Sequence, residues 1–389
     1  MMEERILSEK VIGWRRALHR IPEIGFELPK TTAMVQGELE KMGLTVQRVC
    51  GGSGLTAVID GAAPEGATSK TVALRADMDA LPIREETGLA YASTNGAMHA
   101  CGHDGHTSML LGAAALLCGE RDFPGRVKLI FQPAEENLGG ARNMVAAGVL
   151  EGVDALFGMH AGLLTDAKPG TFSFKVGAST ASFDSFDITV RGQGSHGARP
   201  EDGVDPIVVT AQMLCALQTL ASREHRATDP YVFSIGSIHG GETYNIIPDE
   251  VKLQGCMRAT DEATRQRLKK RVTEIVEGVC AAMRAQGSIR FFDGYQPTVN
   301  EEACTHLAYE KAKAIFGADS VEWMEQPIMV SEDVSEYLAR VPGCFWLYAT
   351  PGGNCRHHSA AFDLDESLLW RGSVLLAEMA KAYLSEGVK

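Results

Sequence analysis

Long apolar runs and clusters of basic residues are both absent from this chain. No apolar stretch approaches the roughly 20 residues that a membrane-spanning helix needs, and the first residues, MMEERILSEKVIGWRRALHR, predict a charged amphipathic helix and not a secretory signal. Lys and Arg (37) are scattered and outnumbered by Asp and Glu (50), so the formal net charge is −13. This charge argues against nucleic acid or a membrane as a partner, and leaves small neutral or zwitterionic molecules as possible substrates.

The cysteines do not indicate a disulfide framework. There are nine, an odd number, and most lie in apolar stretches such as AQMLCALQTL. This usage predicts reduced thiols and a cytoplasmic protein. Eight of the nine are expected to be small buried side chains. Cys101 is the exception, because its neighbours are polar.

Short apolar segments that end in polar or glycine-rich residues alternate with helical segments in the first 180 residues. Examples are TVALRADMDA, VKLIFQPAEE and ALFGMHA. Such alternation predicts an α/β fold with a mixed, largely parallel sheet, in which ligands bind beyond the carboxyl ends of the strands. The polar residues at these ends are Asp77, Asp79, Glu135, Glu136 and His160.

A different pattern fills residues 181–292. Strand, helix, two strands, helix and strand are expected there, and this β-α-β-β-α-β order is typical of a ferredoxin-like α+β domain. The αβ alternation resumes after about residue 293, with CFWLYAT as a strand. We therefore expect a discontinuous catalytic domain, 1–180 and 293–389, with the second domain inserted into it. Two domains are also the default for 389 residues.

The segment MHACGHDGHTSMLLGAA has the highest density of chemically active side chains. Within eight residues it contains His99, Cys101, His103, Asp104 and His106. It could be a metal site, a cysteine nucleophile activated by His103, or an inert loop. Side chains at i and i+2 of an extended segment stand too far apart for a direct hydrogen bond, but both can reach ~2.0–2.3 Å to an ion between them. The pattern therefore favours metal ligation.

Glu135 and Glu136 are adjacent carboxylates that face differently. One can hold a cation while the other takes a proton from water, whose pKa a metal lowers toward ~7. On this chemistry either residue could play either part, and an isolated pair of glutamates is more often a solvated acidic turn.

Two further histidine positions are ambiguous on their own. A lone histidine after an apolar strand, such as His160, is more often a satisfied core residue. Of His357 and His358, in a glycine-rich loop, one is expected at the surface. Together, histidine, thiolate and carboxylate groups suit Zn²⁺ better than Mg²⁺ or Ca²⁺, with manganese, cobalt or nickel as alternatives.

Several motifs occur in a fixed order between about residues 12 and 365. They are HRIPEIGFELPKT, LRADMDALPI, MHACGHDGHTSMLLGAA, FQPAEE, GMHAG, GSHGARPEDGVDPI, NIIPDE and a late HHS. In this order they resemble the aminoacylase/carboxypeptidase-type dinuclear metallopeptidases, above all the branch of hippurate hydrolases and auxin-conjugate amidohydrolases. The CGHDGH and QPAEE blocks are the most specific.

The resemblance implies two divalent metal ions and a set of residues that serve them. The implied ligands are Cys101, His103, Glu136, His160 and His358. His358 is preferred to His357 because Ser359 and Phe362 match the family's spacing. The resemblance also implies Glu135 as general base and Asp79 as the residue that orients a metal ligand. Asp77 stands where many members have a ligand histidine, so its role is open.

The inserted domain resembles the family's lid and dimerisation domain, which implies a homodimer or a dimer-based tetramer. His196 is similar to a histidine that enters the partner's active site in dimeric relatives and stabilises the oxyanion; otherwise it is a surface residue. Asn245 and Arg258 look like groups that bind the substrate's amide or carboxylate. Arg258 could equally cover the sheet with its stem.

The activity that the resemblance implies is hydrolysis of the amide bond of small N-acyl amino acids, such as hippurate or N-acetyl amino acids. The nearest alternative is a dipeptidase or an N-carbamoyl amino acid hydrolase. An alternative from another class is a metal-binding or structural protein with an inactive site.

Overall fold

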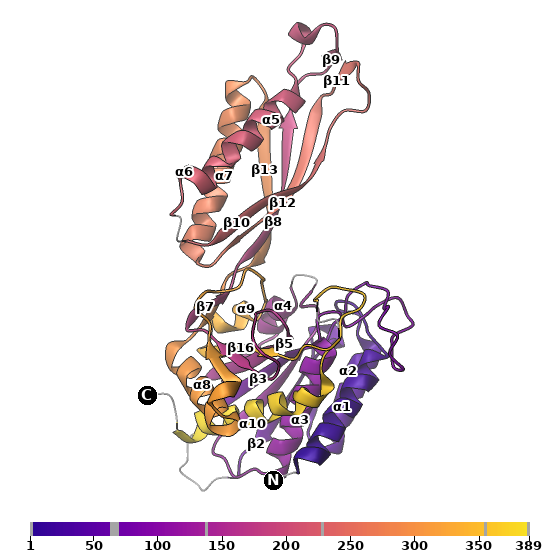
Figure 1. Ribbon diagram of the computed structural model, residues 1–389, viewed down its shortest axis with the longest axis vertical. Helices are drawn as coiled ribbons and strands as arrows, with labels where there is room; N and C mark the ends of the chain where they lie inside the picture. Colours follow the sequence, from indigo (N-terminus) through magenta and orange to yellow (C-terminus); the bar gives the residue numbers. More distant parts are fainter. Residues whose placement is uncertain (1–2, 63–69, 137–138, 227–228, 354–355, 387–389) are drawn as a thin grey trace. The chain divides into compact units, whose positions relative to one another are not determined.

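The computed structural model describes residues 3–62, 70–136, 139–226, 229–353 and 356–386, which form two compact units (Figure 1). Unit 1 comprises Met1–Ser179, Thr298–Ile328 and Asp333–Lys389, and unit 2 comprises Thr180–Pro297 and Met329–Glu332. Relative to the predicted boundaries, unit 2 also includes residues 180, 293–297 and 329–332. Within the described ranges, no helix has the length and apolar character that crossing a membrane requires.

Unit 1 is built on an eight-stranded mixed sheet. Its strands, in spatial order, are β1 (Val46–Val49), β2 (Gly54–Asp60), β4 (Arg126–Gln132), β3 (Thr71–Asp77), β5 (Ala155–Gly162), β16 (Gly343–Ala349), β6 (Phe172–Phe174) and β15 (Val321–Trp323). The central run β4-β3-β5-β16 is parallel, and so is the pair β6 and β15. This confirms the predicted mixed, largely parallel sheet. The central strands β3, β5 and β16 are buried at every position, as expected where both faces are covered.

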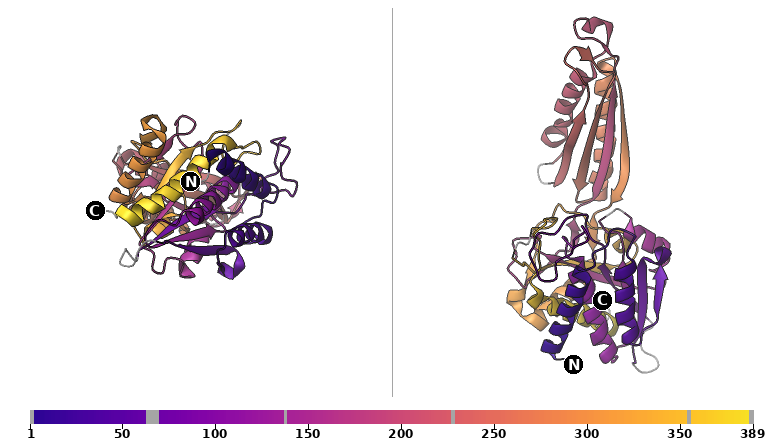
Figure 2. Two further views of the ribbon diagram at one scale, coloured as in Figure 1. Left: turned by 90° about the horizontal axis from the view of Figure 1, so that it is seen from below. Right: turned by 90° about the vertical axis from the view of Figure 1, so that its right-hand side faces the viewer.

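Helices cover the two faces of this sheet, and alternate residues of one strand face opposite sides. On β3, Val72 and Leu74 belong to the larger core and Ala73 belongs to a smaller one. The larger core contains residues of α1 (Glu4–His19), α2 (Pro29–Lys41), α3 (His103–Gly119), α8 (Glu302–Phe316) and α10 (Leu369–Glu386). The smaller core contains residues of α4 (Gly140–Ala146) and α9 (Ser335–Leu338). Figure 2 shows α1, α3 and α10 from two further sides.

Helix α3 explains how the CGHDGH segment is fixed. Its residues are mostly small or apolar and nearly all buried, as in a helix that is surrounded by protein. It packs against α1, α10 and β3. Its first residue is His103, so the start of a deeply buried helix determines where that imidazole lies.

Unit 2 has the predicted β-α-β-β-α-β order. The elements are β8 (Phe183–Arg191), α5 (Pro206–Leu217), α6 (Thr219–Arg223), β10 (Tyr231–His239), β12 (Glu250–Ala259), α7 (Glu262–Ala282) and β13 (Gln286–Tyr295). The sheet order is β10-β12-β8-β13, and all neighbours are antiparallel. The helices α5 and α7 share one core with the sheet. This confirms an inserted ferredoxin-like α+β arrangement.

Two further sheets each consist of one short strand pair. They are β9 (Ser195–His196) with β11 (Ile246–Ile247), and β7 (Gly177–Thr180) with β14 (Thr298–Asn300).

One predicted buried cysteine is exposed. Cys215 lies on α5, but the buried stripe of that helix consists of Val209, Met213 and Leu217, so Cys215 faces away from the sheet. Cys355 lies outside the described residues. The other cysteines besides Cys101 are buried or half-buried thiols: Cys50, Cys118, Cys256, Cys280, Cys304 and Cys344.

Candidate metal centre and active site

Neighbouring parallel strands bring polar residues to one rim of the unit 1 sheet. β3 ends at Asp77, and β5 ends two residues after His160. The Glu135-Glu136 pair follows β4, and β16 leads toward the loop with His357 and His358. All these elements belong to unit 1.

Backbone turns at this rim need unusual conformations. Gly102, before α3, has φ +87°, and a Cβ there would lie 3.2 Å from Leu364 Cδ1. Two of the non-glycine residues with positive φ also lie at this rim: Ala134 (55°), just before Glu135, and His358 (58°). Such conformations cost about 1–3 kcal/mol and persist where the surroundings enforce them, as at binding sites.

The five predicted metal ligands lie close together. Potential ligand atoms of Cys101, Glu136 and His358 lie within 4.8 Å of one another, as do those of Cys101, His160 and His357, and those of His103, Glu135 and Glu136. Cys101 Sγ is 3.4 Å from His160 Nε2, and Glu136 Oε1 is 3.4 Å from His358 Nε2. The residues from four distant stretches of chain therefore form one cluster.

Two buried nitrogens in this cluster lack a hydrogen-bond partner among the described residues. They are His103 Nε2 and His160 Nδ1. Buried polar atoms are rarely left unsatisfied, and imidazole nitrogens beside a thiol and carboxylates are the donor set that Zn²⁺ and related metals prefer. These residues therefore fit a metal ion.

Asp79 forms hydrogen bonds with both glutamates and with His103. Its carboxylate accepts the backbone N–H groups of Glu135 (3.0 Å) and Glu136 (3.2 Å), and its carbonyl oxygen accepts a hydrogen bond from His103 Nδ1 at 2.9 Å. Because Nδ1 donates there, His103 Nε2 is left to face the carboxylates. Burial raises the pKa of Asp79.

Asp77, whose role the sequence left open, has both carboxylate oxygens engaged. Oδ1 lies 2.6 Å from His106 Nδ1, and Oδ2 accepts from the Arg75 guanidinium at 2.8 Å. Burial would raise the pKa of Asp77, but His103, His106 and Arg75 hold it well below its usual range. His106 Nε2 in turn accepts the Ala161 N–H at 2.8 Å. The pair Asp77 and His106 thus has its hydrogen-bonding atoms occupied.

The surroundings of Cys101 do not suit a nucleophile. Burial and the carboxylates of Glu136 and Glu135 raise the pKa of its thiol well above the usual value, whereas a reactive cysteine needs a lowered pKa. A cation beside the sulfur would reverse this effect, since metal-bound cysteine is a thiolate.

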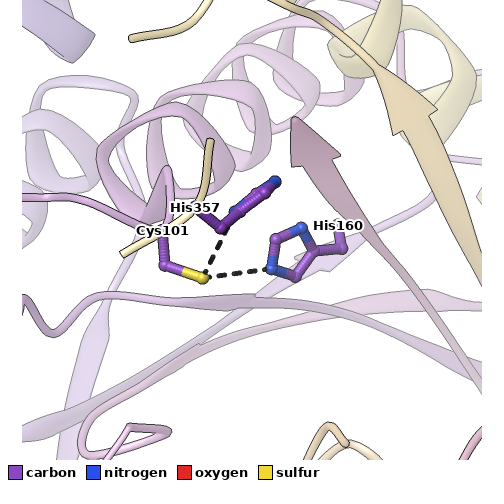
Figure 3. A group of neighbouring side chains, drawn as sticks. All are labelled: Cys101, His160 and His357. Carbon is purple, nitrogen blue, oxygen red and sulfur yellow. Dashed lines mark hydrogen bonds between the residues drawn. The ribbon is translucent and has the colours of Figure 1, made fainter. Parts of the chain in front are cut away.

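One of His357 and His358 was expected at the surface. His358 is the more exposed, with 54% of its side chain accessible. His357 is half-buried, and its Nδ1 lies 3.7 Å from Cys101 Sγ (Figure 3). Burial lowers its pKa to about 4.

Comparison with known proteins identifies the family of this chain. The model of peptidase family M20/M25/M40 matches residues 73–382. The chain belongs to this family. An N-acetyl-L-cysteine deacetylase of Bacillus subtilis is 39% identical over 381 residues, which cover 97% of this M20 chain and 89% of the relative. The hippurate hydrolase of Campylobacter jejuni is 35% identical, with 95% of each chain covered. These relatives place the chain in the amidohydrolase branch, so the family resemblance seen in the motifs is confirmed.

A solved structure extends the likeness to the whole fold. A Bacillus subtilis protein described as a dinuclear metal-binding peptidase of the M20 family superposes on this M20 chain with a TM-score of 0.85 at 34% identity, covering 98% of this chain and 99% of that one.

The three candidate residues of unit 2 fall into two places. His196 in β9 and Asn245 beside β11 are neighbours, because β9 pairs with β11 and the Gly197 N–H donates to the Asn245 carbonyl oxygen at 2.8 Å. Both are exposed. Arg258, in β12, is half-buried, donates to the Met329 carbonyl oxygen at 3.0 Å and lies over the Phe183 ring at 4.9 Å.

Sequence reasoning missed a buried charge network next to this M20 site. Arg15 Nε donates to Asp104 Oδ2 at 2.8 Å, and His19 Nδ1 lies 2.7 Å from the same oxygen. Both residues lie on α1, where Leu7, Val11 and Arg15 follow at intervals of four. A charged residue in line with an apolar stripe was the available signal.

Proposed function

We propose that this M20 chain hydrolyses the amide bond of N-acyl amino acids to a carboxylic acid and a free amino acid, using two divalent cations. The observation that carries the proposal is His103 Nε2, a buried nitrogen without a hydrogen-bond partner among the described residues, which lies 3.8 Å from Glu136 Oε1 in one cluster with Cys101, His160 and His358. The substrate class is supported by the deacetylase and the hippurate hydrolase, which by name act on an N-acylated amino acid. The proposed ligands are Cys101, His103, Glu136, His160 and His358, with zinc as the first candidate and manganese, cobalt or nickel as alternatives.

Cations at this position would polarise the substrate carbonyl and make water more acidic. Glu135 is buried, and Asp79 fixes its backbone. In the proposed reaction the Glu135 carboxylate takes a proton from the attacking water and transfers it to the leaving nitrogen as the C–N bond breaks. Asp79 keeps His103 and the two glutamates oriented.

The residues of unit 2 are proposed to act on the substrate in a homodimer or a dimer-based tetramer. The exposed His196 imidazole would stabilise the oxyanion in a second copy's site, and Asn245 and Arg258 would bind the amide or the carboxylate. Mixing His196→Ala with Glu135→Gln tests this idea, because a mixed dimer regains one site with both groups. Activity that returns on subunit exchange supports it, whereas exchange without any return of activity opposes it.

A substrate panel tests the activity itself. The metal-replete protein should hydrolyse N-acetyl or N-benzoyl amino acids faster than dipeptides or N-carbamoyl amino acids, lose activity with a chelator and regain it with added metal. The dipeptidase and carbamoylase alternatives predict the opposite order of rates. Absence of chelator-sensitive hydrolysis across the panel would refute the proposal.

A further inference from the structure

The backbone after β5 fixes the proton position on His357. The Leu163 N–H donates to His357 Nε2 at 3.2 Å. Because a backbone N–H can only donate, Nε2 carries no proton, and the ring is not an imidazolium. A neutral imidazole has one N–H, so the proton lies on Nδ1, which is the atom 3.7 Å from Cys101 Sγ (Figure 3).

The ring has a position prepared for it. Gly162, the last residue of β5, has φ +136°, and a Cβ there would lie 2.3 Å from both His357 Cε1 and His357 Nε2. Any side chain at this position would therefore displace the imidazole. On another side the ring centroid is 4.8 Å from that of Phe362. The orientation of His357 is thus set by Gly162, Leu163 and Phe362 together.

The same arrangement occurs two residues earlier, within β5. The Ala161 N–H donates to His106 Nε2, so the His106 proton lies on Nδ1 and points at Asp77. The histidines of this rim therefore fall into two kinds. In His106 and His357 both nitrogens have a partner, whereas His103 and His160 each retain a buried nitrogen without one among the described residues.

We propose that His357 is a positioning residue that donates a hydrogen bond from Nδ1 to the Cys101 sulfur and binds no cation itself. The inference rests on the proposed function, in which Cys101 is a ligand. A hydrogen bond to a ligand's sulfur orients it and reduces its electron donation, and such outer contacts typically change metal affinity by about 10–100-fold. Removal of His357 should thus alter the metal–sulfur bond and leave the number of bound ions unchanged.

The proton position can be measured without metal or turnover. Proton–nitrogen spectra of histidine-labelled protein distinguish the two neutral forms and the charged form of each ring, and loss of one signal set in His357→Leu assigns it. We expect the form with the proton on Nδ1, both without metal and after zinc is added. A proton on Nε2, or on both nitrogens, at neutral pH would overturn the inference whatever the protein's activity.

Cobalt binding tests the consequence for the sulfur. His357→Leu should bind as many Co²⁺ ions per subunit as the unmodified protein, but its thiolate-to-cobalt absorption band should move to longer wavelength. His357→Asn, which retains a side-chain N–H near the Nδ1 position, should keep the original band. His160→Ala serves as the comparison and should lose an ion.

The outcomes of the cobalt experiment separate the two proposals. Loss of an ion in His357→Leu would mean that His357 is a ligand, and an unmoved band would mean that it forms no hydrogen bond to the sulfur. Either result overturns this inference and leaves the proposed function standing. An unmodified protein that takes up no Co²⁺ and shows no thiolate band would overturn the proposed function as well.

Discussion

Two buried polar clusters meet at the CGHDGH segment and differ in how their atoms are satisfied. Cys101 and His103 belong to the metal-ligand cluster, in which two buried nitrogens lack hydrogen-bond partners in the part of the chain that the structure describes. Asp104, one residue on, faces the charge network on α1, where Arg15 and His19 both contact its carboxylate. The first cluster brings together thiol, imidazole and carboxylate atoms that suit a cation, whereas in the second the Asp104 carboxylate is already paired with cationic side chains. His99 lies beside the second cluster, with its ring centroid 6.4 Å from that of His19, and both of its buried ring nitrogens lack a hydrogen-bond partner within the described residues.

The largest effect should come from Glu135, in the first cluster. Glu135→Gln retains the size of the side chain but cannot accept the proton, so turnover should fall on the order of 10²–10⁴-fold. Metal content by elemental analysis and the unfolding midpoint should stay as in the unmodified protein. Near-normal turnover would remove Glu135 as the base.

The second cluster should show the reverse response, with Arg15→Met as the main test. Arg15 is fully buried and also donates to Tyr91, Asp363 and Glu366, so its loss leaves the buried Asp104 charge poorly paired. Breaking a buried ion pair costs about 3–5 kcal/mol. Urea unfolding followed by Trp fluorescence measures this in unit 1, because all four tryptophans lie there: Trp14, Trp323, Trp346 and Trp370.

Metal content separates this variant from a change in the ligand cluster. Correctly folded Arg15→Met should bind as many ions per subunit as the unmodified protein. If the variant unfolds at the same urea concentration as the unmodified protein but loses its metal, the second cluster would be needed for metal binding and not for stability.

The contrast between the two clusters also shows what the sequence could reveal. The residues at the rim of the sheet were predictable, because each apolar strand has Asp, Glu or His at or near its end, and this change marks the carboxyl end of the strand. The hydrogen-bond partner of each side-chain atom at the rim was not predictable. The Ala161 N–H occupies His106 Nε2, so the other nitrogen of that ring faces Asp77, and the Asp79 carbonyl oxygen occupies His103 Nδ1. These partners are backbone groups, which every residue has, so the sequence gives no sign of them. His357 was taken as the alternative to His358 for the same reason.

The inserted unit was predictable for a different reason. Its strands and helices have clear hydrophobic periods, and the N-cap residues Asp205 and Asp261 directly precede α5 and α7. The assignment of Met329–Glu332 to unit 2 was not predictable, because a segment of four residues is too short to show a hydrophobic period.

His19 should give a smaller effect that depends on pH. Burial lowers its pKa, but Asp104 and Glu85 outweigh this and raise it to about 9. A folded pKa above the unfolded value of about 6.5 means stabilisation that is full below pH 6.5 and lost as pH rises through 9. The unfolding free energy of metal-free protein should exceed that of His19→Gln by about 1–3 kcal/mol at pH 6 and by much less at pH 10. A difference independent of pH would mean that His19 is not charged in the network.

The smallest effect should come from Arg16, the neighbour of Arg15 on α1. Both arginines donate to Glu366, and Arg16 Nε approaches Glu366 Oε2 at 2.9 Å. However, 47% of the Arg16 side chain is exposed, so water replaces the lost bonds, and exposed ion pairs contribute about 0–1 kcal/mol. Arg16→Met should therefore lower the unfolding free energy by less than about 1 kcal/mol, against the larger loss in Arg15→Met under the same urea titration. Equal losses in the two variants would mean that pairing with Glu366, and not with the buried Asp104, accounts for the stabilisation by Arg15.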